Sequence, residues 1–253
     1  MSNRERLFQF LISLLAAAAA VIGARYGIPI PPPQVHIAPD DPIIPRPAPP
    51  EKPSPVPNPL AAIGRITFGN AGCTGTIIGP RREDGRQMVL TAAHCVQGQP
   101  KKGTMRLRDG RTVGLTVLAT DPRSDCAWAV TDATGEEYPF AQLLGATPKV
   151  GTKLWHAGYG VDNPGNTETG ELLSGPDQNG QVRMRVSVSS GDSGGGICTD
   201  PEGYVVSCVC CTSARGQVAS VWGASPESIR ALMPGGIVRE DWQPLAVPIR
   251  PEP

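Results

Sequence analysis

Apolar and polar positions divide the middle of the chain into short runs that are separated by glycine, proline and charged residues. Short apolar or alternating runs between turn residues are typical of β-strands. In the first half, the predicted strands cover residues 62–68, 72–79, 87–91, 105–107 and 111–118. The last two flank an Asp109-Gly110 dipeptide, which is typical of a hairpin turn. A further apolar run, residues 126–130, follows Asp125.

The same pattern continues in the second half. Predicted strands cover residues 181–188, 196–199 and 204–211, with a turn at 200–203 and a loop at 165–180. The chain then changes to a helical signal, because Ser225 is a suitable N-cap and Pro226 suits the first helical position. A Pro-Gly-Gly sequence at 234–236 should end this short helix.

The N-terminal part has a different character. Residues 1–28 contain the almost wholly apolar segment 7–24, which at about 18 residues is near the lower limit for a membrane span. Its alanine-rich end would also suit cleavage, so residues 1–28 are predicted to be either a signal peptide or a membrane anchor. Residues 29–59 hold half of the 28 prolines and predict an extended linker. Both alternatives place the remainder outside the cytoplasm, either secreted or periplasmic, or associated with a membrane through residues 7–24.

Length and charge limit the remaining possibilities. The chain of 253 residues suggests one compact domain, predicted at 60–234, and a polar, proline-containing tail at 235–253. Its formal net charge of zero gives no indication of a nucleic-acid partner. Aromatic residues are sparse, whereas glycine and proline are abundant, which favours strands and turns over long helices.

Three separated segments carry the candidate chemistry. Ser193 lies in Gly-Asp-Ser-Gly-Gly, where glycines allow a tight turn and the amides of Gly191 and Ser193 could bind an oxyanion. A serine nucleophile needs a base, and His94 follows an apolar run upstream. Asp125 lies between them and opens another apolar run. Read alone, each segment has an ordinary explanation: a glycine-rich loop, a structural histidine and a turn aspartate.

The order histidine, aspartate, serine distinguishes between these explanations, because other triad folds use other orders. Three segments together resemble the trypsin/chymotrypsin-like serine proteases, and are closer to the compact bacterial-type members: Thr-Ala-Ala-His-Cys at 91–95, Asp-Cys-Ala-Trp-Ala-Val at 125–130 and the Ser193 motif. This resemblance implies an all-β fold of two six-stranded antiparallel β-barrels with a short C-terminal helix. It also implies a triad of His94, Asp125 and Ser193, with Gly191 and Ser193 forming the oxyanion hole. Asp121 is a competing acid, but Pro122 makes it a turn residue.

The resemblance also implies a disulfide and a substrate pocket. A bridge between Cys73 and Cys95 would hold the histidine loop, and an oxidising compartment would permit it. The pocket would be formed by Ser187 at its base and by wall residues Cys211, Thr212 and Val218. Since tryptic specificity needs an acid at the position of Ser187, a neutral or apolar substrate side chain is expected. The strand at 153–160 ends in the family's Gly-aromatic-Gly, and His156 on it is interpreted as structural.

Two features depart from the family pattern. Asp192 is present, but no Ile/Val-Val/Ile-Gly-Gly start precedes Ile66 to pair with it, so either cleavage is unnecessary or Asp192 has another partner. The serine that commonly supports the catalytic acid is either Ser207 or is replaced by Cys210. Alternation along a strand predicts that Cys208 and Cys210 share a face and Cys211 points the other way.

The remaining cysteines do not predict a metal site. Cys198 could form a disulfide with Cys208. A metal site would need the Cys-x-Cys-Cys sequence at 208–211 to bind the ion, and this spacing lacks the Cys-x-x-Cys of the usual zinc knuckle. Free thiols are therefore favoured, and no metal or other cofactor is expected.

The sequence therefore predicts a monomeric serine endopeptidase domain that acts on protein or peptide substrates. A catalytically inactive, protease-like binding module on a membrane stalk is the alternative.

Overall fold

The computed structural model describes residues 58–160, 167–212 and 220–234. Contacts divide the chain into two units, residues 1–53 and 54–253, and all the described residues belong to the second. The predicted signal or anchor segment, the linker and the C-terminal tail therefore lie outside the described residues. Among the helices that are described, none is long and apolar enough to cross a membrane.

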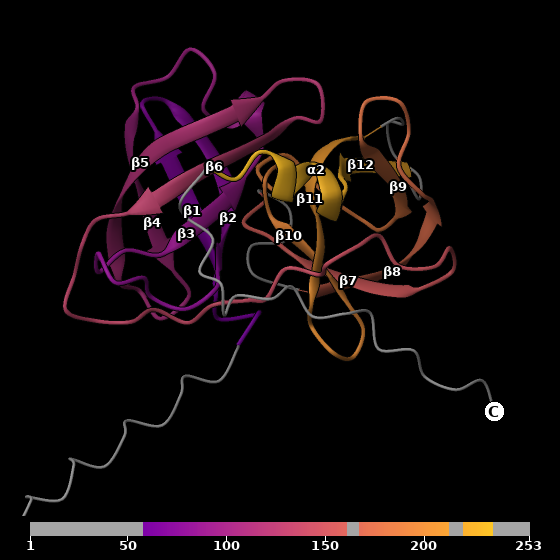
Figure 1. The fold of residues 1–253 in the computed structure, drawn as a ribbon, viewed down its shortest axis with the longest axis horizontal. Helices are drawn as coiled ribbons and strands as arrows, with labels where there is room; N and C mark the ends of the chain where they lie inside the picture. The colour runs from indigo at the N-terminus through magenta and orange to yellow at the C-terminus, as the bar shows by residue number, and fades with distance from the viewer. Residues whose placement is uncertain (1–57, 161–166, 213–219, 235–253) are drawn as a thin grey trace, which may run out of the picture. The chain divides into compact units, whose positions relative to one another are not determined.

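The first half of the described chain closes into a six-stranded antiparallel barrel (Figure 1). Its strands follow the order β1-β2-β3-β6-β5-β4 around the barrel. Their bounds are β1 Ile63–Phe68, β2 Ala71–Ile78, β3 Met88–Thr91, β4 Lys102–Leu107, β5 Thr112–Asp121 and β6 Cys126–Thr131. Strand β6 is buried along its whole length, as its nearly unbroken apolar sequence requires.

The second half forms a second closed barrel beside the first, with the order β10-β11-β12-β9-β8-β7. Its strands are β7 Lys153–Ala157, β8 Thr167–Ser174, β9 Gln181–Arg185, β10 Gly196–Thr199, β11 Val205–Thr212 and β12 Ser220–Ala224. The described residues thus confirm the predicted chymotrypsin-like architecture of two six-stranded antiparallel barrels with one short helix.

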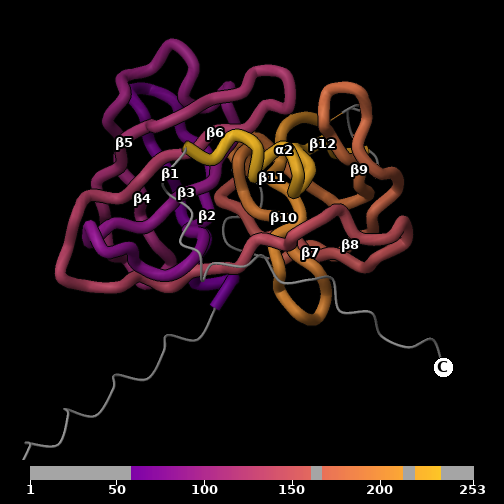
Figure 2. The backbone as a smooth tube through the Cα atoms, in the orientation of Figure 1, coloured from indigo at the N-terminus to yellow at the C-terminus, as the bar shows by residue number. Residues whose placement is uncertain are grey.

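The helix α2, Pro226–Ala231, begins as the sequence predicts. Ser225 is the N-cap, and its Oγ accepts a hydrogen bond from the Ser228 amide at 3.2 Å. The indole Nε1 of the fully buried Trp128 on β6 donates to the Ile229 carbonyl at 2.9 Å. This bond ties the C-terminal helix to the first barrel, and the helix also contacts β11 of the second barrel, beside which it lies in Figure 2.

The predicted loop at 165–180 is wrong in its first part, because residues 167–174 form strand β8. Strand β8 pairs with β7 on one side and β9 on the other, so it is needed to close the barrel. Its sequence, Thr-Glu-Thr-Gly-Glu-Leu-Leu-Ser, buries only Leu172. A strand with one buried side chain carries little apolar periodicity, and its neighbours rather than its own sequence specify it.

Strand β11 contains an irregularity near the Ser193 loop. The pairing of β11 with β12 shifts register between Val209 and Cys211, which places Cys210 at a β-bulge. A bulge inserts an extra residue and breaks the regular alternation of side chains. The prediction that Cys211 points away from Cys210 is accordingly wrong, since their Sγ atoms lie 3.2 Å apart.

Replacement of Phe68 by alanine is expected to lower the free energy of unfolding by about 3–5 kcal/mol. Phe68 ends β1 and is fully buried in the apolar core of the first barrel, so the truncation leaves a cavity. Leu118→Ala is the control, because that side chain is 40% exposed and should cost about 0.5 kcal/mol or less. Urea unfolding of both variants checks this, and equal losses would contradict the assignment of Phe68 to the core.

Candidate active site

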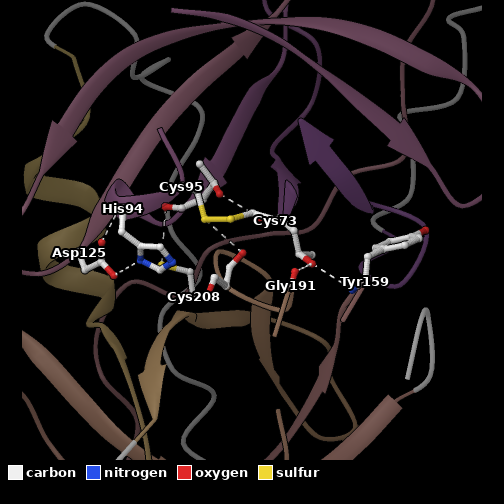
Figure 3. Close-up of a disulfide and its surroundings, with 10 residues drawn as sticks. Cys73, His94, Cys95, Asp125, Tyr159, Gly191 and Cys208 are labelled. Atoms are coloured by element: carbon white, nitrogen blue, oxygen red, sulfur yellow. Dashed lines mark hydrogen bonds and ion pairs between the residues drawn. A yellow bond between two sulfur atoms is a disulfide. The ribbon is translucent and has the colours of Figure 1, made fainter. Parts of the chain in front are cut away.

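His94 lies in a single turn of 3₁₀ helix, Ala93–Cys95, which directly follows β3. Cys95 in the same turn forms the predicted disulfide with Cys73 on β2, with an S–S distance of 2.07 Å. A ring nitrogen of His94 lies within 4.8 Å of both sulfur atoms. Figure 3 shows His94 beside the disulfide. Because both sulfurs are already in a disulfide, this group offers no thiolates to a metal. The disulfide instead fixes the segment that carries His94.

Asp125 binds the histidine at two points. Its Oδ2 lies 2.7 Å from His94 Nδ1, and its Oδ1 accepts a hydrogen bond from the His94 amide at 2.8 Å. The backbone of Asp125 has φ 54°, a left-handed conformation that aspartate tolerates better than most residues. The Asp125 carbonyl also accepts from the Ala93 amide at 3.2 Å. Together these bonds fix both the position of the histidine turn and the orientation of the imidazole.

The ion pair shifts the pKa values of both groups. The hydrogen bond that His94 donates to Asp125 is the main cause that raises the pKa of His94 above its ordinary value of 6.5, against the opposing effect of burial. Burial raises the pKa of Asp125, but the hydrogen bonds from His94 and from the Cys210 thiol outweigh it and bring this pKa below the ordinary value. The His94 side chain is 45% exposed, so it remains accessible to a reactant.

Ser193 lies on a turn held by contacts from both barrels. Its carbonyl accepts a hydrogen bond from the Thr74 amide of β2 at 2.9 Å, and the next amide, of Gly194, donates to Val209 of β11 at 2.7 Å. Gly194 has φ 83°, and a Cβ there would collide with the Thr91 Oγ1 and the Thr74 carbonyl oxygen. Only glycine therefore allows the chain to leave Ser193 in this direction.

The turn before Ser193 leaves two amides available. Asp192 N donates to the Ser189 carbonyl at 3.1 Å, and Gly191 has φ 101°, as the third residue of a type II turn requires. Thr74 Oγ1 donates to the Gly191 carbonyl at 2.8 Å and fixes this peptide. Within the described part of the chain, the amides of Gly191 and Ser193 have no hydrogen-bond acceptor.

Ser193 and His94 are neighbours without a direct bond. The Cys95 Sγ, one residue from His94, lies 3.7 Å from the Ser193 carbonyl oxygen. No hydrogen bond between Ser193 Oγ and the imidazole is present among the described residues. Catalytic hydrogen bonds are often long in the absence of substrate and shorten when it binds. The predicted triad is therefore brought to one place, with its His94–Asp125 pair formed.

Asp192 has a partner that the sequence did not indicate. Its Oδ1 accepts from the Gly160 amide at 2.7 Å, its Oδ2 accepts from the Ser189 amide at 2.7 Å, and His156 Nε2 lies 3.8 Å from Oδ2. Burial raises the pKa of Asp192, but His156 and these amides lower it more, so it lies below the ordinary value. His156, interpreted above only as a structural residue of its strand, is buried on β7 and faces Asp192.

The structure distinguishes between the two candidates for the group that supports Asp125. Ser207 Oγ donates to the Ala224 carbonyl at 2.8 Å and does not contact Asp125. Cys210 holds that place, because its thiol is near enough to Asp125 to lower the pKa of that carboxyl. Asp121, the competing acid, instead accepts bonds within its own turn, from Ser124 Oγ at 2.6 Å and from the Arg123 amide at 3.0 Å.

The predicted substrate pocket is only partly described. Ser187, Cys211 and Thr212 are exposed to solvent, whereas Val218 lies outside the described residues. A hollow of about 430 Å³ is present elsewhere, beside the His94 turn, lined by Val96, Lys101 and Val117 among others.

The disulfide considered between Cys198 and Cys208 is not present, because both are free cysteines. Cys198 is fully buried, and Cys208 interacts with Cys126.

Two closed barrels, a His–Asp ion pair and a serine on a glycine turn between the barrels together define the trypsin-like class of proteins. Residues 73–207, more than half of the chain, match the family model of the trypsin-like peptidase domain. The chain belongs to this family. No curated protein matches the chain.

Solved structures share the fold. An inactive form of Rv3671c from Mycobacterium tuberculosis H37Rv, carrying a serine-to-alanine mutation, is 21% identical with a TM-score of 0.54, over 71% of this chain and 94% of that chain. The Rv3671c protease in another inactive form is 22% identical, with a TM-score of 0.54 over 69% and 88%. A serine endoprotease from Yersinia pestis is 16% identical, with a TM-score of 0.59 over 71% and 66%.

Proposed function

We propose that this protein is a serine endopeptidase that cleaves protein or peptide substrates through a covalent acyl-enzyme. The observation that carries the proposal is the double contact of Asp125 with His94, at 2.7 and 2.8 Å, beside the Ser193 turn. An aspartate in this position selects the imidazole tautomer that carries its proton on Nδ1, which leaves Nε2 free to act as a base.

The residues then have distinct roles in the reaction. Ser193 Oγ attacks the peptide carbonyl carbon while His94 takes its proton, and His94 returns that proton to the leaving amine. Asp125 stabilises the imidazolium that forms. The amides of Gly191 and Ser193 donate to the developing oxyanion, for which their lack of other acceptors makes them suitable. Water then hydrolyses the acyl-enzyme by the same steps, and no cofactor or metal takes part.

Labelling with a fluorophosphonate probe tests this function. The probe phosphonylates an activated serine, so the full chain should be labelled at Ser193 and the Ser193→Ala variant should not be labelled. Ser190→Ala is a matched control, since that serine is exposed on the same turn and should leave labelling intact. A folded wild-type protein that the probe does not label would favour the inactive binding module instead.

We further propose that the enzyme acts outside the cytoplasm as a monomer, secreted or anchored through residues 7–24.

The substrate pocket that we propose has Ser187 at its base and Cys211, Thr212 and Val218 in its wall, and it would accept a neutral or apolar side chain. Ser187 carries no charge to bind arginine or lysine. Cleavage-site mapping in a peptide library measures this preference, and cleavage mainly after arginine or lysine would contradict it.

The rate of fluorophosphonate labelling is expected to rise with pH through a midpoint above 6.5. His94 must be neutral to accept the serine proton, and its hydrogen bond to Asp125 raises its pKa above 6.5. The imidazole therefore stays charged to a higher pH than usual, so activity is present above the raised pKa and is lost as the pH falls through it. A midpoint at or below 6.5, in protein shown by circular dichroism to remain folded, would contradict the prediction.

Labelling of Ser193 is expected to require no cleavage of the chain. The Asp192 carboxylate already accepts amide bonds from Gly160 and Ser189 and faces His156, so it does not depend on a new N-terminal amine. The labelling rate of the full chain, measured before and after limited proteolysis of its N-terminal region, should be the same within about twofold. Labelling of Ser193 that appears only after proteolysis would show that the chain is a zymogen.

A further inference from the structure

Two thiols lie together next to the candidate active site. Cys210 and Cys211 are consecutive residues of β11, and on a regular strand their side chains would point to opposite faces. The β-bulge at Cys210 changes this arrangement and brings the two Sγ atoms to 3.2 Å. That distance is longer than the ~2.05 Å of a disulfide bond, so the pair is a reduced dithiol whose sulfurs are in contact.

The two thiols have different environments. Cys211 is exposed, whereas Cys210 is buried and accepts a hydrogen bond from Gln181 Nε2 at 3.5 Å. The Cys210 thiol donates to the Cys211 sulfur, and this bond is the main cause that lowers the pKa of Cys211 to about 7, with a further contribution from His94. The same hydrogen bond to Cys211 is the main cause that raises the pKa of Cys210, and burial and the proximity of Asp125 raise it further.

This arrangement separates the two roles needed in thiol oxidation. A thiolate, not a thiol, is the nucleophile that reacts with oxidants, and it must be accessible. Cys211 supplies an exposed thiolate close to neutral pH, and Cys210 supplies a second sulfur within reach. Cys126 and Cys208 also contact one another, but both are fully buried and provide no such access.

We propose that Cys210 and Cys211 form a modification site at which a peroxide closes a vicinal disulfide beside the catalytic aspartate. The Cys211 thiolate attacks one peroxide oxygen, the O–O bond breaks, and the hydroxide that leaves takes a proton to become water. Cys211 is then a sulfenic acid. The Cys210 sulfur attacks the Cys211 sulfur, the S–O bond breaks, and a second water leaves with the Cys210 proton. Two thiols are oxidised and one hydrogen peroxide is reduced to two waters.

The bond formed in this way should be easily reversed. Consecutive Cα atoms are about 3.8 Å apart across a trans peptide, whereas disulfides usually join Cα atoms about 4.4–6.8 Å apart. A disulfide between neighbouring residues is therefore strained, and strained, exposed disulfides are reduced more readily than structural ones. The Cys73–Cys95 bridge joins Cα atoms 6.2 Å apart, which is within the usual range, and should persist under mild reduction.

Oxidation would act on the catalytic groups through Cys210, and this consequence rests on the proposed function. The Cys210 thiol, which now helps to lower the pKa of Asp125, is lost when the disulfide forms. The end of β11 would also change shape, where Cys211 and Thr212 form the predicted pocket wall. The expected result is a fall of roughly tenfold or more in the labelling rate of Ser193, the change produced by losing one polar interaction with a charged group.

The chemical step is tested without any activity, in the full-length Ser193→Ala protein so that no self-cleavage interferes. After treatment with hydrogen peroxide, mass spectrometry should find the peptide that contains residues 210 and 211 lighter by two hydrogens. Mild thiol reductant should restore it. Before oxidation, phenylarsine oxide should bind the same two residues, since a trivalent arsenical bridges thiols that lie close together. Cys211→Ser should abolish both results, and Cys198→Ala, which removes a fully buried thiol, should change neither.

Two results would overturn the proposal. One is a Cys211 that accumulates as a stable sulfenic or sulfinic acid while Cys210 remains a free thiol. The other is a pair that stays reduced under peroxide while Met233, which is partly exposed, oxidises. Because the mapping uses a protein without the Ser193 hydroxyl, its failure is independent of any failure of wild-type labelling. A disulfide that forms but leaves the wild-type labelling rate unchanged would contradict the regulatory consequence alone.

Discussion

Replacement of His94 by alanine is expected to reduce kcat on the order of 10⁶-fold, the largest effect that we predict for a single substitution. His94 is the candidate base, and its imidazole is oriented by Asp125 at 2.7 Å. Without it, Ser193 would remain a neutral hydroxyl, which is a weak nucleophile. Hydrolysis of fluorescently labelled casein by purified wild-type and variant protein measures the loss.

The matched comparison is the double variant that lacks both His94 and Ser193. If the two residues act as one unit, the double variant should be about as inactive as either single variant, because their contributions are not additive. The disulfide beside His94 should remain intact in all three proteins, which thermal unfolding can check. An alanine variant that retains more than about a hundredth of wild-type activity would exclude His94 as the base.

The short apolar runs were sufficient to predict most strands of the first barrel, because residues such as Val89 and Leu90 lie in buried strands with clear boundaries. The order of the three candidate motifs then indicated the double-barrel fold. The cap at Ser225 also acted locally, so the start of α2 could be predicted from two residues. Information of this kind is contained in a few neighbouring positions, which is why the sequence alone provides it.

Other features depend on contacts between distant segments. Strand β8 has one buried side chain, Leu172, and is specified by pairing with β7 and β9. The bulge at Cys210 reverses the orientation expected for Cys211, and nothing in the local sequence marks it. His156 meets Asp192 only because β7 and the Ser193 loop are adjacent in the second barrel. A signal did exist, because Asp192 lacked the usual N-terminal partner and so needed another group to face it.

The second large effect is expected at Asp125, where asparagine should lower kcat by about 10⁴-fold. An amide at this position can donate to His94 Nδ1 and so select the wrong tautomer, with the proton on Nε2, where the base must accept one. The variant also removes the main cause that raises the pKa of His94. Its remaining activity should therefore follow a pH profile whose midpoint lies below that of the wild type.

Asp121→Asn provides the matched control for this substitution. Asp121 lies four residues earlier and is the competing candidate for the catalytic acid. Among the described residues, its carboxylate accepts bonds only from the Ser124 hydroxyl and from nearby amides. The asparagine oxygen can keep some of these bonds, so kcat should change by less than about tenfold and the pH midpoint should not move. Casein hydrolysis measured across a pH series for both variants separates the two aspartates. A larger loss in Asp121→Asn than in Asp125→Asn would reverse the assignment, whereas the expected order would identify Asp125 as the group that makes His94 a base.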